Sequence, residues 1–291
     1  MKKLVSAFSL SLIAIIALTV SCDERTAENG GDVSQVDVDS SKSTIVNVSG
    51  KLFSIPSPIQ TASLIDRENT PYRIDALADY NLADNIPERN MKALNLGMLG
   101  IDMVYSSFYD DAQNSLKYYK AVDKLAVDLE LKSAIDQELI KRVGSNVDNA
   151  DSLIYLSSSF YQALDAYLKE NDRSEIATLV LTGAWVESTM LTAISESKPA
   201  KEALAAQKKA SATLYKLIAK IELGNNDFSE QLDSLNTSFA NIEKEYQYVT
   251  PEVIPDQKKT IIKSESSYKL SDSLYTDIQM RLIKLHRIIN G

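Results

Sequence analysis

The stretch SEIATLVLTGAWVESTMLTAIS, residues 174–195, decides the fold. It is apolar on nearly every side from Ile176 to Val186, whereas a helix at the surface has one apolar stripe and one polar face. We therefore predict a helix that runs through the middle of an all-α domain.

Glycines inside helical segments indicate close packing around this helix. Gly183 lies within it, and Gly97 and Gly100 lie within an earlier apolar segment. Each costs about 1 kcal/mol relative to alanine in a helix interior. We expect the close approach of two helix backbones, or space for a large side chain such as Trp185, to offset this cost.

Apolar residues recur at spacings of three and four through most of residues 51–291, which is typical of amphipathic helices. We expect about eight helices packed as antiparallel pairs, with two subdomains as the alternative. Caps are predicted at Asn149 or Asp151 and at Ser271. The apolar faces are Met91, Leu94, Met98, Ile101, Tyr105 and Phe108; Leu153, Leu156, Phe160, Leu164 and Tyr167; Leu204, Ala210, Leu214, Leu217, Ile218 and Ile221; and Leu274, Ile278, Leu282, Leu285 and Ile289.

Three kinds of segment interrupt the helical pattern. Gly144 and Gly224 each follow a helical run, and we expect them in the left-handed conformation that ends many helices. Residues 44–55 alternate weakly, which predicts a short strand or an extended strap. Residues 250–266 are the least helical part of the domain, and a short strand is expected there.

Residues 1–21 have the features of a signal peptide, because Lys2 and Lys3 precede an apolar and small-residue run from Leu4 to Val20. A transmembrane helix is the alternative, but it needs about 20 apolar residues, and the run from Leu4 to Val20 has only 17. Cys22, the only cysteine, follows this run as the lipidated cysteine of a bacterial lipobox does, although Thr19 departs from the commonest lipobox pattern. A multiply acylated Cys22 would be a stable membrane anchor.

Residues 22–50 predict the lipidated cysteine and a flexible tether, since polar and small residues dominate without a helical period. Asp23-Glu24 resembles the surface-export signal of Bacteroidota lipoproteins, whereas aspartate at this place resembles inner-membrane retention in other bacteria. We expect the outer membrane, on its periplasmic or surface face. Removal of residues 1–21 leaves 31 − 2 = 29 basic and 40 acidic residues, a net charge of −11, which disfavours nucleic acid as a partner.

Glu187 and Asp102 lie near the helical glycines in apolar surroundings, so each is expected to be partly buried with a partner. A buried carboxyl group with a raised pKa suits general-acid chemistry, and two that face each other could bind a cation or a sugar. Structural pairing with a tyrosine or a basic side chain is the more ordinary interpretation. Together with Trp185 and Tyr105 they form the candidate pocket.

The aromatic residues gather in two clusters. At helical spacing such residues are most often core-edge residues with wet hydroxyl groups, whereas exposed together they could stack sugars or peptides. The clusters are Tyr105, Phe108, Tyr109, Tyr118 and Tyr119, and Phe160, Tyr161 and Tyr167.

Residue types that carry common chemistry are scarce in this chain. His286, the only histidine, is interpreted as a surface residue whose charge suits the end of the last helix. With one histidine and one lipidated cysteine, the chain lacks the ligands of usual zinc sites and the residues of a triad, and it has no Gly-rich phosphate loop. We expect no catalytic residue of these kinds, no metal and no cofactor.

Three short runs carry a resemblance to a known family. They are Phe53-Ser54-Ile55-Pro56-Ser57-Pro58-Ile59-Gln60; Lys92-Ala93-Leu94-Asn95-Leu96-Gly97 with Asp102 and Tyr105; and Gly183-Ala184-Trp185-Val186-Glu187. The chain resembles uncharacterised all-helical lipoproteins of Bacteroidota over most of the mature domain. This resemblance implies the location and the fold, and it implies no activity.

Two hypotheses on function follow. The first is a non-enzymatic binding or scaffold lipoprotein of the cell envelope, which holds a peptide, a glycan or an envelope protein in grooves between helix pairs. The second is a carboxylate-dependent enzyme or cation-binding module that uses Glu187 and Asp102, which requires both carboxyl groups in one pocket.

Overall fold

The computed structural model describes residues 70–131, 137–196, 198–248, 250–254, 256, 258–261 and 264–291, together with two strands at Ser43–Val48 and Lys51–Pro56. The expected signal peptide, Cys22 and the expected tether as far as residue 42 lie outside the described residues.

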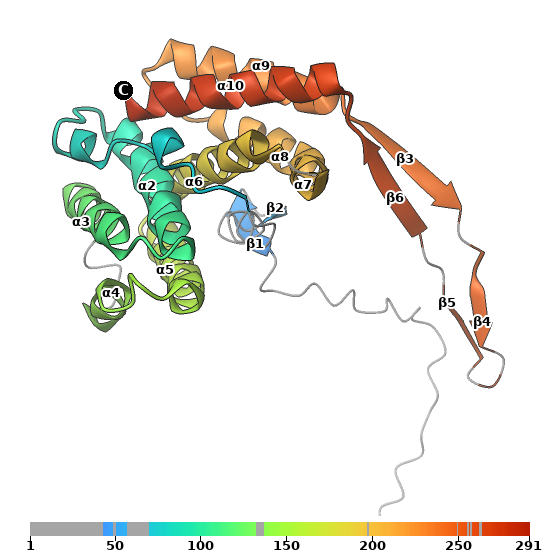
Figure 1. Ribbon diagram of the computed structural model, residues 1–291, viewed down its shortest axis with the longest axis horizontal. Helices are drawn as coiled ribbons and strands as arrows, with labels where there is room; N and C mark the ends of the chain where they lie inside the picture. The colour runs from blue at the N-terminus through green and yellow to red at the C-terminus, as the bar shows by residue number, and fades with distance from the viewer. Residues whose placement is uncertain are drawn as a thin grey trace, which may run out of the picture. The chain divides into compact units, whose positions relative to one another are not determined.

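The described part of the domain is largely all-α, as predicted, with nine α-helices and two short 3-10 helices (Figure 1). The helices are η1 (Ile74–Ala76), η2 (Tyr80–Asp84), α2 (Arg89–Phe108), α3 (Ala112–Asp128), α4 (Gln137–Gly144), α5 (Ala150–Glu170), α6 (Ser174–Ser195), α7 (Lys198–Ala206), α8 (Lys208–Ile218), α9 (Asn226–Ala240) and α10 (Asp272–Asn290).

Helix α6 is the central helix that its composition predicts. Every residue from Thr178 to Ala193 is buried. Helix α2 is nearly as enclosed, since it is buried from Ala93 to Leu99 and again from Ile101 to Ser107. The single apolar face predicted for α2 therefore includes only part of its buried surface. These two helices make the most extensive contact in the domain, and the rest of the core packs around them.

Glycine lets the backbones of α2 and α6 touch. A Cβ atom on Gly97 would lie 1.9 Å from the Val180 carbonyl oxygen, and one on Gly183 would lie 1.9 Å from the Leu94 carbonyl oxygen. No side chain fits at such distances. The close backbone approach expected from the sequence is therefore confirmed at both positions, and this contact offsets the helix propensity that glycine lacks.

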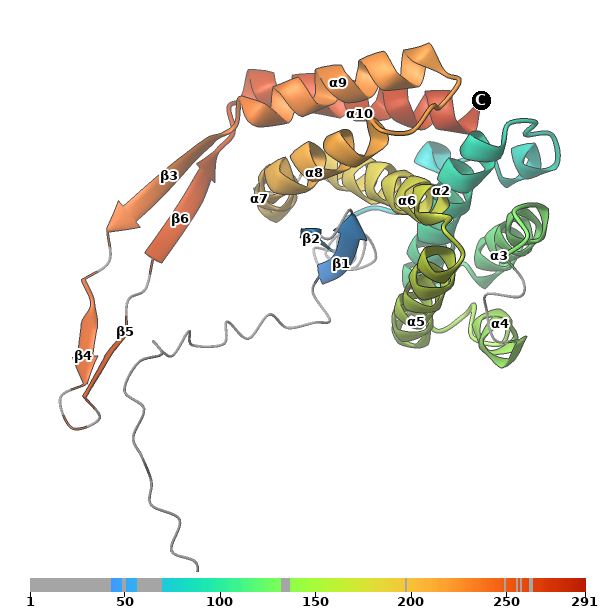
Figure 2. The same ribbon diagram turned by 180° about the vertical axis from the view of Figure 1, so that it is seen from behind.

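Antiparallel neighbours surround this pair. Helix α3 returns along α2 after a tight turn at Asp110, which has a φ of 56°. Helix α10 runs antiparallel to α6, because Tyr275 near its start bonds to Ala193 near the end of α6, whereas His286 near its end bonds to Glu187. Helix α9 packs beside α10 and also contacts α8 (Figure 2).

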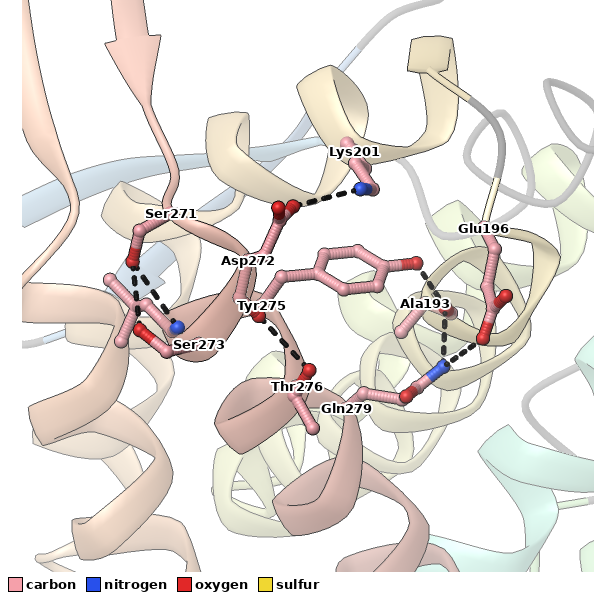
Figure 3. A network of polar contacts seen from close by, with 10 residues as sticks. Ala193, Glu196, Lys201, Ser271, Asp272, Ser273, Tyr275, Thr276 and Gln279 are labelled. Carbon is pink, nitrogen blue, oxygen red and sulfur yellow. Dashed lines mark hydrogen bonds and ion pairs between the residues drawn. The ribbon is translucent and has the colours of Figure 1, made fainter.

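The start of α10 is fixed by the cap that the sequence predicts. The Ser271 hydroxyl group accepts a hydrogen bond from the Leu274 backbone N–H at 3.3 Å. Lys201 of α7 forms an ion pair with Asp272 at 3.2 Å, and Tyr275 and Gln279 both donate to the Ala193 carbonyl oxygen (Figure 3). The cap at Asn149 is also confirmed, since its side chain accepts from Ser152 N–H at 2.9 Å.

The prediction for Gly144 and the apolar face predicted at residues 204–221 need correction. Gly144 is the last residue of α4 and lacks a positive φ; a Cβ atom there would lie 3.0 Å from the Tyr119 ring, so packing explains the glycine better than backbone conformation. Gly224 does have a φ of +70°, as predicted. The apolar face at 204–221 is divided between α7 and α8 at Gln207, whose side chain turns inward and bonds to Trp185.

Three antiparallel strand pairs complete the described elements. β1 (Ser43–Val48) pairs with β2 (Lys51–Pro56), where the weak alternation predicted a strand or a strap. β3 (Glu243–Tyr248) pairs with β6 (Ser264–Lys269), and β4 (Glu252–Ile254) pairs with β5 (Lys259–Ile261). The sequence predicted only a short strand in the second region. We refer to residues 243–269 as the arm, which joins the end of α9 to the start of α10.

Candidate functional site

Asp102 of α2 and Glu187 of α6 are brought together in the centre of the domain. Both are completely buried. Asp102 Oδ2 accepts a hydrogen bond from the Ala78 backbone N–H at 3.0 Å, and Glu187 Oε2 lies 2.7 Å from His286 Nδ1. The two carboxyl groups are close enough for each to shift the pKa of the other. We refer to Asp102, Glu187 and His286 as the buried triad.

One oxygen atom of each carboxyl group has no hydrogen-bond partner among the described residues. These atoms are Asp102 Oδ1 and Glu187 Oε1. Two ionised carboxylates close together in a buried site would repel each other, and a proton on one of them removes that repulsion. Burial therefore favours a triad in which the carboxyl pair holds at least one proton.

Burial controls the charge of the triad. Desolvation, reinforced by the nearby Glu187, raises the pKa of Asp102 well above its ordinary value. Desolvation also raises the pKa of Glu187, to about 8, although the hydrogen bond from Asp102 opposes this shift. For the His286 imidazole, desolvation lowers the pKa below 6.5. All three shifts act against charge, so burial favours the neutral form of each group.

The prediction for His286 was wrong, because this residue is buried rather than at the surface. Only 8% of it is exposed, and it closes the triad from α10. The sequence does hold a signal for this, since His286 follows Leu282 by four residues on the apolar stripe of α10. Its charge near a helix end suggested a surface position, but the stripe decides its orientation.

Trp185 and Tyr105 do not join the triad. The Trp185 indole Nε1–H donates to Gln207 Oε1 at 3.0 Å, and its ring lies 5.9 Å from that of Phe239. The Tyr105 hydroxyl group accepts from the Arg73 backbone N–H at 3.3 Å. Both side chains are about 1% exposed, so neither offers a surface to a ligand. The structure thus unites two of the four predicted pocket residues.

The first aromatic cluster holds the segment that precedes α2. The Tyr109 hydroxyl group donates to the Thr70 carbonyl oxygen at 2.6 Å, and Tyr118 donates to the Ala78 carbonyl oxygen at 2.9 Å. The rings of Tyr72 and Tyr109 stack at 4.8 Å. Tyr109 and Tyr118 pack in or against the core, as the core-edge interpretation predicts. The wet hydroxyl groups expected with it were wrong for these two residues, because both hydroxyl groups bond to backbone. In the second cluster, the Tyr161 side chain lies outside the described residues.

An apolar pocket of about 50 Å³ lies at the junction of α2 with the helices from α3 to α6. Its lining includes Gly100, Tyr119, Phe160 and Val180, with Asp123 as its one charged residue. Neither Asp102 nor Glu187 contributes to it. The triad and this pocket are therefore separate features, and the mostly apolar lining of the pocket is typical of a space left between packed helices.

The described residues offer little for metal chemistry. No group of three or more His, Cys, Asp or Glu residues among them is arranged to hold a metal ion, and the triad is no exception. What the triad can do chemically is hold and share protons among three side chains from α2, α6 and α10, while the Ala78 N–H donates a hydrogen bond to Asp102.

One described helix, α6, is long and apolar enough to cross a membrane. However, 94% of its most apolar window is buried inside the domain, as is usual for the core helix of a folded protein. It is therefore weak evidence for a membrane span.

Comparison with known proteins does not add a function to this geometry. No family model matches the chain, and neither a curated protein nor a solved structure matches it. The buried triad, the apolar pocket and the exposed arm are the features from which a function has to be argued.

Proposed function

We propose that this chain is a cell-envelope lipoprotein, anchored through Cys22, whose helical domain is a non-enzymatic binding or scaffold module. One observation supports the proposal that the helical domain is not an enzyme. Asp102 and Glu187, the carboxyl pair best suited to catalysis, are fully buried and bonded to Ala78 and His286. A substrate would have to displace α10 to reach them, which is a poor arrangement for turnover.

The membrane anchor is supported by the N-terminal sequence. Two lysines, an apolar run and then Cys22 precede a polar segment, and the outer membrane is the location that we propose. The resemblance to lipoproteins of Bacteroidota supports the same location. An acidic mature chain agrees with a partner other than nucleic acid, such as a peptide, a glycan or an envelope protein.

The anchor is tested by replacing Cys22 with serine in cells that make the full-length chain. We expect the unmodified chain in the membrane fraction with a mass that includes acyl chains, and the Cys22→Ser chain in the soluble or secreted fraction. A Cys22→Ser chain that stays with the membrane contradicts anchoring through this residue.

The alternative, a carboxylate-dependent enzyme or cation-binding module, is tested by thermal unfolding with Ca²⁺, Mg²⁺, Zn²⁺ and a panel of oligosaccharides. A binding module with a closed triad predicts no stabilisation that depends on the triad. A rise in melting temperature that is present in the unmodified chain and lost in Glu187→Gln favours the alternative. Glu175→Gln, at an exposed position in the same helix, is the matched control.

A further inference from the structure

The arm is an amphipathic ribbon. Alternate residues of a strand point to opposite faces, so Lys244, Tyr246 and Tyr248 share one face of β3, and Tyr268 joins it as the partner of Lys244. Lys244 Nζ lies 4.9 Å from the centre of the Tyr246 ring and 5.8 Å from that of Tyr268. We refer to these four residues as the tyrosine face.

Most of the tyrosine face is uncovered. Tyr246 is 73% exposed and Tyr248 is 86% exposed. Tyr268 is the exception, since it packs against the core. Tyrosine supplies a large contact area with little loss of side-chain freedom, which makes it common in protein interfaces. An aromatic face left open on a polar ribbon therefore indicates an interaction surface.

The β3–β6 ribbon has only two strands. Two-stranded ribbons are marginally stable in water, and at least three strands with an apolar face are usually needed. β6 contacts α7, whereas β3 forms the outer edge of the ribbon in both views (Figures 1 and 2). Among the described residues, the backbone groups along that edge bond to no third strand, so they can pair with another strand.

We propose that β3 pairs with β3 of a second copy of this chain, antiparallel across a two-fold axis, to form a four-stranded sheet. This inference goes beyond the proposed function, because it concerns self-association. A two-fold contact uses the same strand on both copies, so one edge suffices for a closed dimer.

The proposed dimer has one register, which disulfide cross-linking can distinguish from its neighbours. For the tyrosine faces of two copies to coincide, even-numbered residues must lie opposite even-numbered residues. With Tyr246 opposite Tyr246 of the second copy, Lys244 lies opposite Tyr248 on both sides of the axis. Such aromatic and cation–aromatic pairs stabilise antiparallel strands. The next register places Glu245 opposite its own copy, and like charges there are destabilising.

Charge explains why a second copy meets the chain at the arm. The whole chain carries a net charge of −9, so two copies repel each other over most of their surfaces. The arm is neutral, with five acidic and five basic residues, and repulsion is therefore least there. These residues are Glu243, Glu245, Glu252, Asp256 and Glu265, and Lys244, Lys258, Lys259, Lys263 and Lys269.

The test measures the mass of the full-length chain by sedimentation equilibrium at several concentrations. Cys22→Ser is present throughout, so that no lipid contributes to association. We expect a concentration-dependent dimer. Tyr246→Lys, which places two ammonium groups opposite each other, should weaken it at least about tenfold. Tyr155→Lys is the matched control, because Tyr155 is 67% exposed but lies on α5, and it should leave the dimer intact.

A disulfide tests the register directly. Residues directly opposite in antiparallel strands have Cβ atoms about 4.5–5.5 Å apart, close to the range of a disulfide. Tyr246→Cys should therefore form a covalent dimer under a mild oxidant, whereas Tyr155→Cys should not.

Several results would overturn the inference: a monomer at every concentration, a dimer that Tyr246→Lys leaves unchanged, or equal cross-linking by both cysteine variants. An unchanged melting temperature in Tyr246→Lys would show that the domain itself is intact. A monomeric chain would leave the proposed function standing, since anchoring and partner binding are measured separately.

Discussion

Asp102 and Glu187 have different proton affinities in the folded and unfolded chain, so the stability of the domain is linked to pH. The ordinary pKa of Glu187 is 4.5 and its folded pKa is about 8. Between these values the folded chain keeps a proton that the unfolded chain has released, and the free energy of unfolding falls as pH rises. Asp102 acts in the same direction, because its pKa is also raised.

We expect the free energy of unfolding to fall by about 2 kcal/mol between pH 6.5 and pH 8 from Glu187 alone. The opposite contribution of His286 fades as pH rises above 6.5, because the unfolded chain then loses the proton that the folded chain does not hold. Urea denaturation at a series of pH values measures the effect. Glu187→Gln should flatten the profile in this window, whereas the exposed Glu175→Gln should not. A Glu187→Gln profile as steep as that of the unmodified chain contradicts the assignment.

The contact between Gly183 and Leu94 permits a second prediction. Gly183→Ala adds a methyl group 1.9 Å from a backbone oxygen, so α2 and α6 must separate. We expect a loss of about 3 kcal/mol in the free energy of unfolding, despite the better helix propensity of alanine. Gly224→Ala is the comparison, since nothing lies within 4 Å and only its φ of +70° opposes it, at about 1 kcal/mol. Equal losses at the two positions would contradict a steric role for Gly183.

At the scale of single elements, two side chains of α10 donate hydrogen bonds to the same carbonyl oxygen near the end of α6. Tyr275 and Gln279 both donate to the Ala193 carbonyl oxygen (Figure 3). Two donors on one carbonyl oxygen use both of its lone pairs, and they fix the position of α10 along α6. The alignment that results places His286 against Glu187, several turns away.

We expect Tyr275→Phe to lower the free energy of unfolding by about 1 kcal/mol, because the buried ring stays while its hydrogen bond is lost. Tyr155→Phe, at an exposed tyrosine, should change it by less than about 0.5 kcal/mol. A double variant with Gln279→Ala measures the coupling between the two donors. A coupling energy near zero would indicate that the bonds do not act together.

Helices whose patterns were strong could be predicted from the sequence closely. The bounds of α6 and the caps at Asn149 and Ser271 follow from composition and local chemistry alone. The division between α7 and α8 could not be foreseen, because neither proline nor glycine marks it and the residue at the break, Gln207, is buried against Trp185. The four arm strands were also missed in part, since their paired residues are mostly polar and lack an apolar period.

The candidate site was predicted to the same partial extent. Apolar surroundings predicted that Asp102 and Glu187 would be partly buried, and the structure buries both completely and brings them together. The partners, the Ala78 backbone and His286, could not be identified, because they come from segments 24 and 99 residues away along the chain. Tertiary packing decides such contacts, and no local pattern encodes them.

At the scale of the whole molecule, one continuous core joins the helices, whereas the arm lies largely outside it. None of the described side chains at the arm tip, residues 254–261, is buried. Replacing residues 252–261 by an Asn-Gly turn should therefore change the melting temperature by less than about 2 °C. Thermal unfolding followed by circular dichroism checks this. A loss of 5 °C or more would show that the tip supports the core.

The position of His286 in a chain of 291 residues also has a consequence for the order of events during synthesis. A ribosome delivers Asp102 and Glu187 long before it delivers their partner on α10. The contact between Glu187 and His286 can therefore form only once α10 has been made, so the triad is completed after the two helices that supply its acids, α2 and α6.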